Sequence, residues 1–154
     1  MDHLVCFLPG TLALGYWFSK QIHVGKSVVP EWHLDLAKEI AYTCHEMYKI
    51  NSCGLAPEIT QFEQKGREIF VKPLDNFSIL RPEAVESWFY LYRITGEQKY
   101  RDWGWEFFES LRKNAKLPDD GGYASQENLA GKLKTRDRME SFFLGETMKY
   151  WKIF

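Results

Sequence analysis

The sequence predicts an all-α domain of paired antiparallel helices with long loops and a short β-hairpin. Apolar residues recur at helical spacing in residues 31–49, 82–94 and 98–113. The second and third of these segments are separated by a tight link around Gly96, so they are expected to form an antiparallel helical hairpin. The segments between the helices are rich in Gly, Pro, Asn and Asp and are expected to be loops: residues 15–30, 51–80 and 116–136.

The first apolar stretch, residues 4–18, resembles a signal peptide in composition but not in layout. Asp2 and His3 stand where a signal peptide has basic residues, and Pro9-Gly10 interrupts the apolar run. The chain also lacks a run of about 20 apolar residues that would span a membrane. We therefore expect no membrane contact by this segment and no targeting signal in the chain.

The first predicted helix, residues 31–49, follows Pro30, a favourable residue for a first helical turn. Its apolar face consists of Leu36, Ala37, Ile40, Ala41, Cys44, Met47 and Tyr48. In the loop that follows, residues 59–62 and 68–71 alternate in polarity and enclose turn residues. These two runs are the predicted β-hairpin.

Local signals mark the ends of the later helices. Pro82 opens the second helix and Gly96 ends it. Thr95 and Gln98 are spaced as a capping box for the third helix. Asp137 with Glu140 is the predicted cap of a fourth helix. The inward residues of these helices are expected to be Val85, Trp88, Phe89 and Tyr92, then Tyr100, Trp103, Phe107 and Leu111, and finally Met139, Phe142, Phe143 and Trp151.

Composition and charge exclude some classes of function. The 154 residues carry 20 Lys and Arg against 21 Asp and Glu, so an electrostatically driven nucleic-acid binder is excluded. Aromatic residues make up 16% of the chain, which serves either a large core or a binding surface. Composition alone leaves both alternatives open.

Several carboxylates stand where acid–base chemistry is feasible. Glu83 follows Pro82 in a first helical turn, where the free N–H groups and the helix dipole favour an ionised base. Glu86 lies one turn along the same face, and Glu58 follows Pro57 in a loop. Carboxylates that converge in one pocket are typical of glycosidases. The plain alternative is that acidic residues simply start helices well, and spacing alone favours that alternative for Glu83.

Phe142 and Glu146 form an aromatic and acidic pair at i and i+4. Such a pair suits a sugar, with the ring as an apolar platform and the carboxylate as an acceptor for hydroxyls. More often it marks the border of a core face. His23, His33 and His45 have no metal-ligand spacing.

The three cysteines, Cys6, Cys44 and Cys53, lack the spacing of a zinc site. One disulfide with one free thiol is compatible with their number, and buried free thiols are the alternative for Cys6 and Cys44. Asn76-Phe77-Ser78 matches the N-glycosylation pattern, which matters only in a secretory location.

Five segments, taken in chain order, resemble class I α-1,2-mannosidases, glycoside hydrolase family 47, and within it the members of the endoplasmic reticulum. They are DHLVCFLPGTLALG (2–15), LAPE (55–58), LRPEAVES (80–87), YRDWGW (100–105) and MESFFLGET (139–147). Five motifs in the family's order are far more specific than any single carboxylate.

The resemblance implies an (α/α)₇ barrel and the inverting removal of terminal α-1,2-linked mannose from high-mannose N-glycans, with calcium in the site. It implies that Glu83 is the catalytic base and Glu58 a further active-site carboxylate. Sugar-contacting roles are implied for His3, Arg81, Glu86, Phe142 and Glu146, and a disulfide is implied between Cys6 and Cys44. Such a disulfide indicates the lumen of the endoplasmic reticulum or Golgi.

The resemblance also implies what residues 1–154 do not contain. They match roughly the second half of the family's catalytic domain, without its acid and without the threonine that ligates calcium directly, so no direct metal ligand is expected here. We therefore expect the isolated chain to be inactive and its parent to be a type II membrane protein that trims N-glycans. The alternative function is a non-catalytic mannose-binding lectin of quality control.

Overall fold

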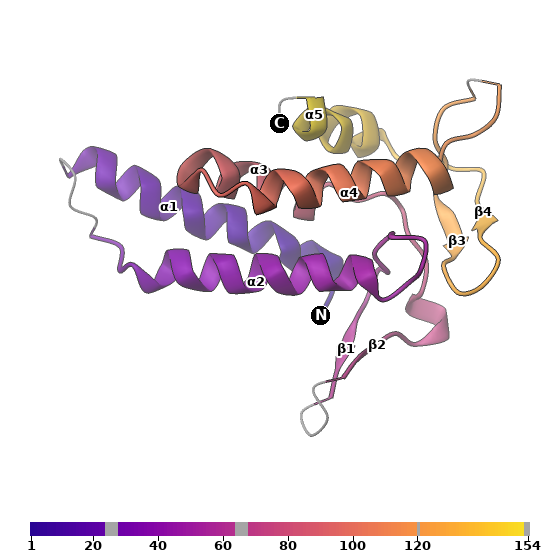
Figure 1. Ribbon diagram of the computed structural model, residues 1–154, viewed down its shortest axis with the longest axis horizontal. Coiled ribbons are helices and arrows are strands. Elements are labelled where there is room, and N and C mark those ends of the chain that lie inside the picture. The colour runs from indigo at the N-terminus through magenta and orange to yellow at the C-terminus, as the bar shows by residue number, and fades with distance from the viewer. Residues whose placement is uncertain (24–27, 64–67, 120, 153–154) are drawn as a thin grey trace.

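The computed structural model describes residues 1–23, 28–63, 68–119 and 121–152 (Figure 1). Its main elements are the helices α1 (Leu8–Ile22), α2 (Trp32–Lys49), α3 (Glu83–Thr95) and α4 (Lys99–Asn114). α1 and α2 run side by side, and α3 packs against α1, α2, α4 and the short C-terminal helix α5 (Met148–Lys152). The predicted all-α class and the α3–α4 hairpin are confirmed.

Helix α1 is the main departure from the sequence-based prediction. A loop was expected over residues 15–30, but residues 15–22 continue a helix that starts at Leu8. Pro9 lies in its first turn, where proline is tolerated, so it does not break the apolar run. Gly10 permits the close approach of α1 to α3, because a Cβ there would lie 3.1 Å from Ser87 Oγ. Of the remaining expected loop, residues 24–27 lie outside the described part.

The core lies between α2, α3 and α4, where the predicted inward faces are largely confirmed. Trp88 and Tyr100 are completely buried, and Trp103, Phe107 and Leu111 also face inward. Leu36 on α2 and Met139, which precedes η3, are exceptions, because they are 40% and 43% exposed. Buried aromatic rings of this size contribute much of the apolar area that stabilises the fold.

The predicted capping box of α4, formed by Thr95 and Gln98, is wrong. Thr95 is still the last residue of α3. Its hydroxyl donates to Leu91 O and accepts from Glu97 N–H, which precedes α4, so it caps nothing in α4. The amide of Gln98 donates to Asp102 instead of reaching back to Thr95. Gly96, with φ of 73°, ends α3 as predicted, since the left-handed conformation favours glycine.

The predicted cap of the last helix also fails. The carboxylate of Glu140 is paired with Arg138, and regular helix starts only at Ser141. The backbone then forms a π-helical turn, η3 (Phe143–Thr147), before α5 begins. π-helical turns are rare and occur frequently at functional sites.

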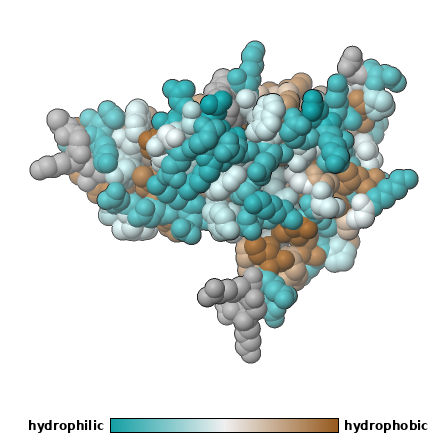
Figure 2. All heavy atoms as spheres, in the orientation of Figure 1, coloured by the Kyte–Doolittle hydropathy of each residue, from teal (hydrophilic) through white to brown (hydrophobic). Residues whose placement is uncertain are grey.

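Two antiparallel strand pairs flank the helices. β1 (Gln61–Phe62) pairs with β2 (Ile69–Phe70), which confirms the predicted hairpin in shorter form. β3 (Gln126–Asn128) pairs with β4 (Lys134–Thr135) in a segment expected to be loop. Short 3₁₀ turns, η1 (His3–Phe7) and η2 (Pro73–Asp75), complete the described elements. Figure 2 shows that the face formed by α2 and α4 is mainly hydrophilic, with apolar surface near β1.

Candidate active site

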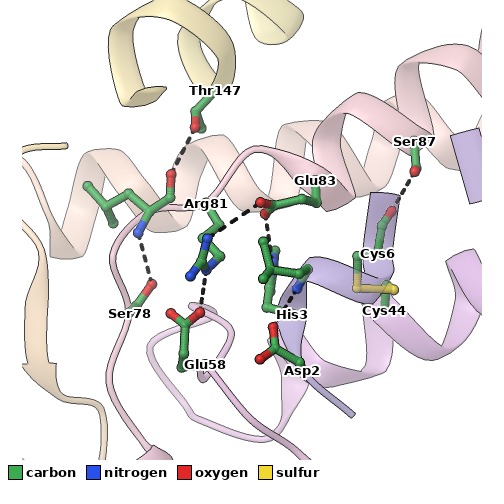
Figure 3. A network of polar contacts seen from close by, with 12 residues as sticks. Asp2, His3, Cys6, Cys44, Glu58, Ser78, Arg81, Glu83, Ser87 and Thr147 are labelled. Atoms are coloured by element: carbon green, nitrogen blue, oxygen red, sulfur yellow. Dashed lines mark hydrogen bonds and ion pairs between the residues drawn. A yellow bond between two sulfur atoms is a disulfide. The ribbon is translucent and has the colours of Figure 1, made fainter. Parts of the chain in front are cut away.

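A network of polar side chains lies at the N-terminal end of α3, where η1 and residues 55–58 meet it (Figure 3). The backbone builds this meeting point before any side chain acts. His3 N–H donates to Glu58 O at 2.9 Å, and Glu58 N–H donates to Asp75 O at 3.1 Å. An isolated bridge between Asp2 and Ile59 continues the same pairing. The loop carboxylate and the histidine are therefore neighbours although 55 positions separate them in the sequence.

Glu83 is the first residue of α3 and lies at the centre of the network. Its Oε2 atom is 3.2 Å from Nδ1 of His3, and its Oε1 atom is 3.6 Å from Nη1 of Arg81. The side chain is 12% exposed. The helix N-terminus and the guanidinium both place positive charge beside this carboxylate. Both oxygens are thus held in a defined direction.

Arg81 links the two carboxylates of the network. Its Nε atom donates to Oε1 of Glu58, while its Nη1 atom faces Glu83. Its guanidinium carbon lies 6.0 Å from the ring centroid of Phe142, within the range of a cation–π contact. The ring of Phe142 therefore borders the same network.

The backbone just before Arg81 is strained. Leu80 is buried and has a φ of 62°, which costs a non-glycine residue about 1–3 kcal/mol. Its carbonyl accepts a 2.8 Å hydrogen bond from the hydroxyl of Thr147 in η3, and its N–H donates to Ser78 Oγ at 3.4 Å. These contacts hold the strained residue and tie η3 to the start of α3.

Glu86 lies one turn further along α3 and is nearly buried. Its Oε1 atom accepts a 2.6 Å hydrogen bond from the hydroxyl of Tyr150. Burial raises the pKa of the Glu86 carboxyl, and the negative charges of Glu146 and Glu83 add to the rise, although the Tyr150 hydrogen bond opposes it. Glu146 itself is exposed in η3.

The structure thus gathers all seven predicted site residues at one end of α3. His3, Glu58, Arg81 and Glu83 form direct contacts. Phe142 borders Arg81, and Glu146 interacts electrostatically with Glu86. Their catalytic and sugar-binding roles remain predictions.

Three residues of the network were not predicted as site residues: Tyr48, Ser87 and Tyr150. Tyr48 donates or accepts a 2.9 Å hydrogen bond with His3 Nε2, and helical spacing had placed it correctly on the inward face of α2. Ser87 donates to Cys6 O and accepts from Gly10 N–H. For the two tyrosines, the sequence offered one signal, because a buried tyrosine hydroxyl usually has a polar partner.

A disulfide joins Cys6 in η1 to Cys44 in α2, the pair that the resemblance implies. It lies three residues after His3 and four residues before Tyr48. Cys53 is free and half-buried, and burial raises the pKa of its thiol.

The donors described here do not form a direct calcium site. Within the described ranges, no group of three or more His, Cys, Asp or Glu side chains could hold a metal ion. Carboxylate oxygens suit calcium, but those of Glu58 and Glu83 are engaged by Arg81 and His3. In the same part of the chain no helix is both long and apolar enough to cross a bilayer.

A hollow of about 740 Å³ lies away from the Glu83 network, between α4 and the η3–α5 segment. Its walls are mainly apolar and include Trp105, Phe108, Leu144 and Trp151. The carboxylates Glu58, Glu83 and Glu86 do not line it. Size alone therefore does not identify the candidate active site.

Comparisons with known proteins find relatives over nearly the whole chain. The chain is 50% identical to an endoplasmic reticulum mannosyl-oligosaccharide 1,2-alpha-mannosidase of Homo sapiens over 97% of its length. It is 41% identical to the enzyme of the same name from Schizosaccharomyces pombe, also over 97%. The chain spans 21% and 30% of these relatives' lengths.

A solved structure also matches the fold. An alpha-1,2-mannosidase from Trichoderma reesei aligns with a TM-score of 0.79 and 24% identity, covering 98% of this chain and 32% of that one. This likeness supports the predicted α/α barrel architecture. The model of glycosyl hydrolase family 47 matches residues 1–153, and together with these identities it shows that the chain belongs to glycosyl hydrolase family 47.

Proposed function

We propose that this chain contributes the catalytic base of an inverting α-mannosidase, which removes terminal α-1,2-linked mannose from high-mannose N-glycans. The observation that carries the proposal is the placement of Glu83 at the start of α3, with His3 and Arg81 on its two oxygens. The names of the relatives, mannosyl-oligosaccharide 1,2-alpha-mannosidases, supply the substrate class.

In this mechanism Glu83 takes a proton from a water molecule. The water oxygen bonds to the anomeric carbon as the bond from that carbon to the glycosidic oxygen breaks. A general acid outside residues 1–154 protonates the departing oxygen, and the configuration of the sugar inverts. Inverting enzymes hold the two carboxyls about 6.5–9.5 Å apart to leave room for the water.

The other site residues bind and orient the sugar. Phe142 offers an apolar ring beside the Arg81 guanidinium, and Glu146 and Glu86 accept hydrogen bonds from hydroxyl groups. His3 holds Glu83, and Glu58 is a further active-site carboxylate that fixes the guanidinium of Arg81 through Nε. A defined orientation of base and substrate supplies a large part of a rate enhancement.

We further propose that residues 1–154 form part of a larger catalytic domain in a parent protein. The chain spans about a fifth of its mammalian relatives' lengths, which supports this division. Calcium, when bound by the complete domain, would help to bind the sugar hydroxyls. The parent is expected in the lumen of the endoplasmic reticulum or Golgi, anchored as a type II membrane protein, and the isolated chain is expected to be inactive.

The test is Glu83→Gln in the complete parent protein, assayed for mannose release from a high-mannose oligosaccharide. Turnover should be lost, by roughly 10²-fold or more, because general base catalysis contributes about that much. Glycan binding should persist. Glu109→Gln, which removes a partly exposed carboxylate on α4, is the matched control and should leave turnover unchanged.

Two outcomes would contradict the proposal. Full turnover in Glu83→Gln would refute the assignment of the base. A wild-type parent that binds the glycan without releasing mannose would instead identify a lectin.

A further inference from the structure

Tyr48 lies beneath the candidate active site, at the C-terminal end of α2. Its hydroxyl is 2.9 Å from His3 Nε2, and the other nitrogen of that ring is 3.2 Å from Glu83 Oε2. We propose that Tyr48 is a positioning residue for Glu83, acting through the imidazole of His3. This inference rests on the proposed function, because it assigns the base to Glu83.

The positions of the protons follow from the partners. An ionised Glu83 carboxylate only accepts hydrogen bonds, so Nδ1 of His3 must carry the proton that lies between them. Nε2 is then an acceptor, and the Tyr48 hydroxyl donates to it. Among the described residues, His3 is the one hydrogen-bond partner of this hydroxyl. Tyr48 therefore selects the tautomer of His3 that serves Glu83.

Burial keeps the tyrosine in its donating form. Tyr48 is 6% exposed, and its burial, together with the negative charges of Glu83 and Glu58, raises its pKa well above the usual value. The hydroxyl consequently keeps its proton across the pH range of the secretory pathway.

The surrounding contacts prevent the imidazole from following a movement of Glu83. The Cys6–Cys44 disulfide fastens η1 to α2, and the Ser87 hydroxyl fastens Cys6 O to α3. The backbone N–H of His3 donates a hydrogen bond to the backbone carbonyl of Glu58. With η1 fixed at these points, the direction of the His3 ring depends on its two nitrogens, and one of them depends on Tyr48.

The test is Tyr48→Phe in the complete parent protein, which removes one oxygen and leaves the ring contacts with Trp88 and Phe107 in place. Tyr100→Phe is the matched control, since the Tyr100 hydroxyl is buried and has no hydrogen-bond partner among the described residues. Mannose release by the control should be unchanged.

For Tyr48→Phe, kcat should fall roughly tenfold to a hundredfold, the effect of a small misplacement in an active site. KM should stay constant, because the Tyr48 hydroxyl is buried and bonds the His3 ring. The acidic limb of the kcat/KM profile should move to higher pH, since the ionised base loses an oriented donor. An unchanged kcat, or a loss of kcat with a fixed pH profile and a raised KM, would overturn the proposal.

A second measurement does not depend on turnover. Nitrogen-15 NMR of the parent with labelled histidine should show His3 with a protonated Nδ1 and an unprotonated Nε2, and Tyr48→Phe should shift the Nε2 resonance. A doubly protonated His3 at neutral pH, or an unaffected resonance in the variant, would overturn the proposal. If Glu83→Gln kept full turnover, the proposed function would fail, while the NMR result would still decide whether Tyr48 sets the His3 tautomer.

Discussion

Two buried histidines are held in different ways: His3 at the site end, where η1 meets α3, and His45 at the packed end, where α2 faces Trp103 of α4. His3 has a partner on each nitrogen, Glu83 and Tyr48. His45 bonds Glu106 through Nε2 at 2.8 Å, but its Nδ1 is buried without a hydrogen-bond partner in the described chain. Its ring instead stacks on Trp103, with centroids 4.3 Å apart and planes at 14°.

The difference teaches that the site end depends on polar partners and the other end on packing. A buried polar group that loses its partner costs about 1–3 kcal/mol, so the site end should be sensitive to single-atom changes. A ring that mainly packs tolerates replacement by a ring of similar volume. The two ends therefore make opposite predictions for conservative substitutions.

The largest effect is expected from removing the covalent link of the site end. Cys6→Ser with Cys44→Ser should lower the free energy of unfolding by about 4 kcal/mol, since the disulfide closes a loop with a sequence separation of 38. Denaturant unfolding of the oxidised parent and the variant measures this difference. Cys53→Ser, the matched control, removes a thiol outside the disulfide, and a loss there of similar size would contradict the comparison.

Sequence reasoning predicted the packing more fully than the polar network. Helical spacing identified the faces of α2 to α4, because apolar periodicity is a local signal. The resemblance supplied the site residues, but their pairing is set by long-range contacts such as His3 with Glu58 O. Tyr48 was therefore assigned to the core, although its hydroxyl serves the site.

The errors of the sequence-based prediction also arise from long-range contacts. α1 was missed because Pro9-Gly10 normally signals a break, whereas here Gly10 allows α1 to pack closely on α3. The left-handed Leu80 has no sequence signal, since a bulky residue is unfavourable at a φ of 62°. A tertiary contact from Thr147 and a local one from Ser78 hold it. Local propensity was overridden where segments distant in sequence meet.

A smaller effect is expected from the amide pair that braces the loop below the site. Asn51 and Asn76 exchange two side-chain hydrogen bonds, of 2.9 and 3.2 Å, and Asn76 is 8% exposed. Asn76→Ala should cost about 1–3 kcal/mol of unfolding free energy, because the amide of Asn51 is left without its partner. Chemical denaturation is the measurement, with exposed Asn128→Ala as the control.

The same pairing decides the meaning of the glycosylation pattern at residues 76–78. A glycan on the Asn76 nitrogen would replace the hydrogen bond to Asn51 and would have to leave a buried position. We therefore expect the parent protein to carry an unmodified Asn76. Mass spectrometry of the peptide that contains it would contradict this view if it found the glycosylated form at high occupancy.

The smallest effect is expected at the packed end. His45→Phe should change the unfolding free energy at neutral pH by less than about 1.5 kcal/mol, because the stacking on Trp103 is retained and the lost partner, Glu106, is 60% exposed. A larger loss would show that His45 is held by its polar contact, as His3 is.

The pH dependence of stability sharpens this last prediction. Burial lowers the pKa of His45, and the hydrogen bond to Glu106 only partly opposes it. The unfolded chain then binds the proton more tightly than the folded chain, so the stability contribution is complete above the unfolded pKa of about 6.5 and is lost as the pH falls through the lowered folded value. Glu86 contributes with the opposite sign, since its raised pKa makes stability fall as the pH rises above its unfolded value.

Subtracting the pH profile of His45→Phe from that of the wild type removes the Glu86 contribution. The difference should decrease from pH 7 toward pH 5, and a difference that is flat or increases would show that burial does not control the protonation of His45.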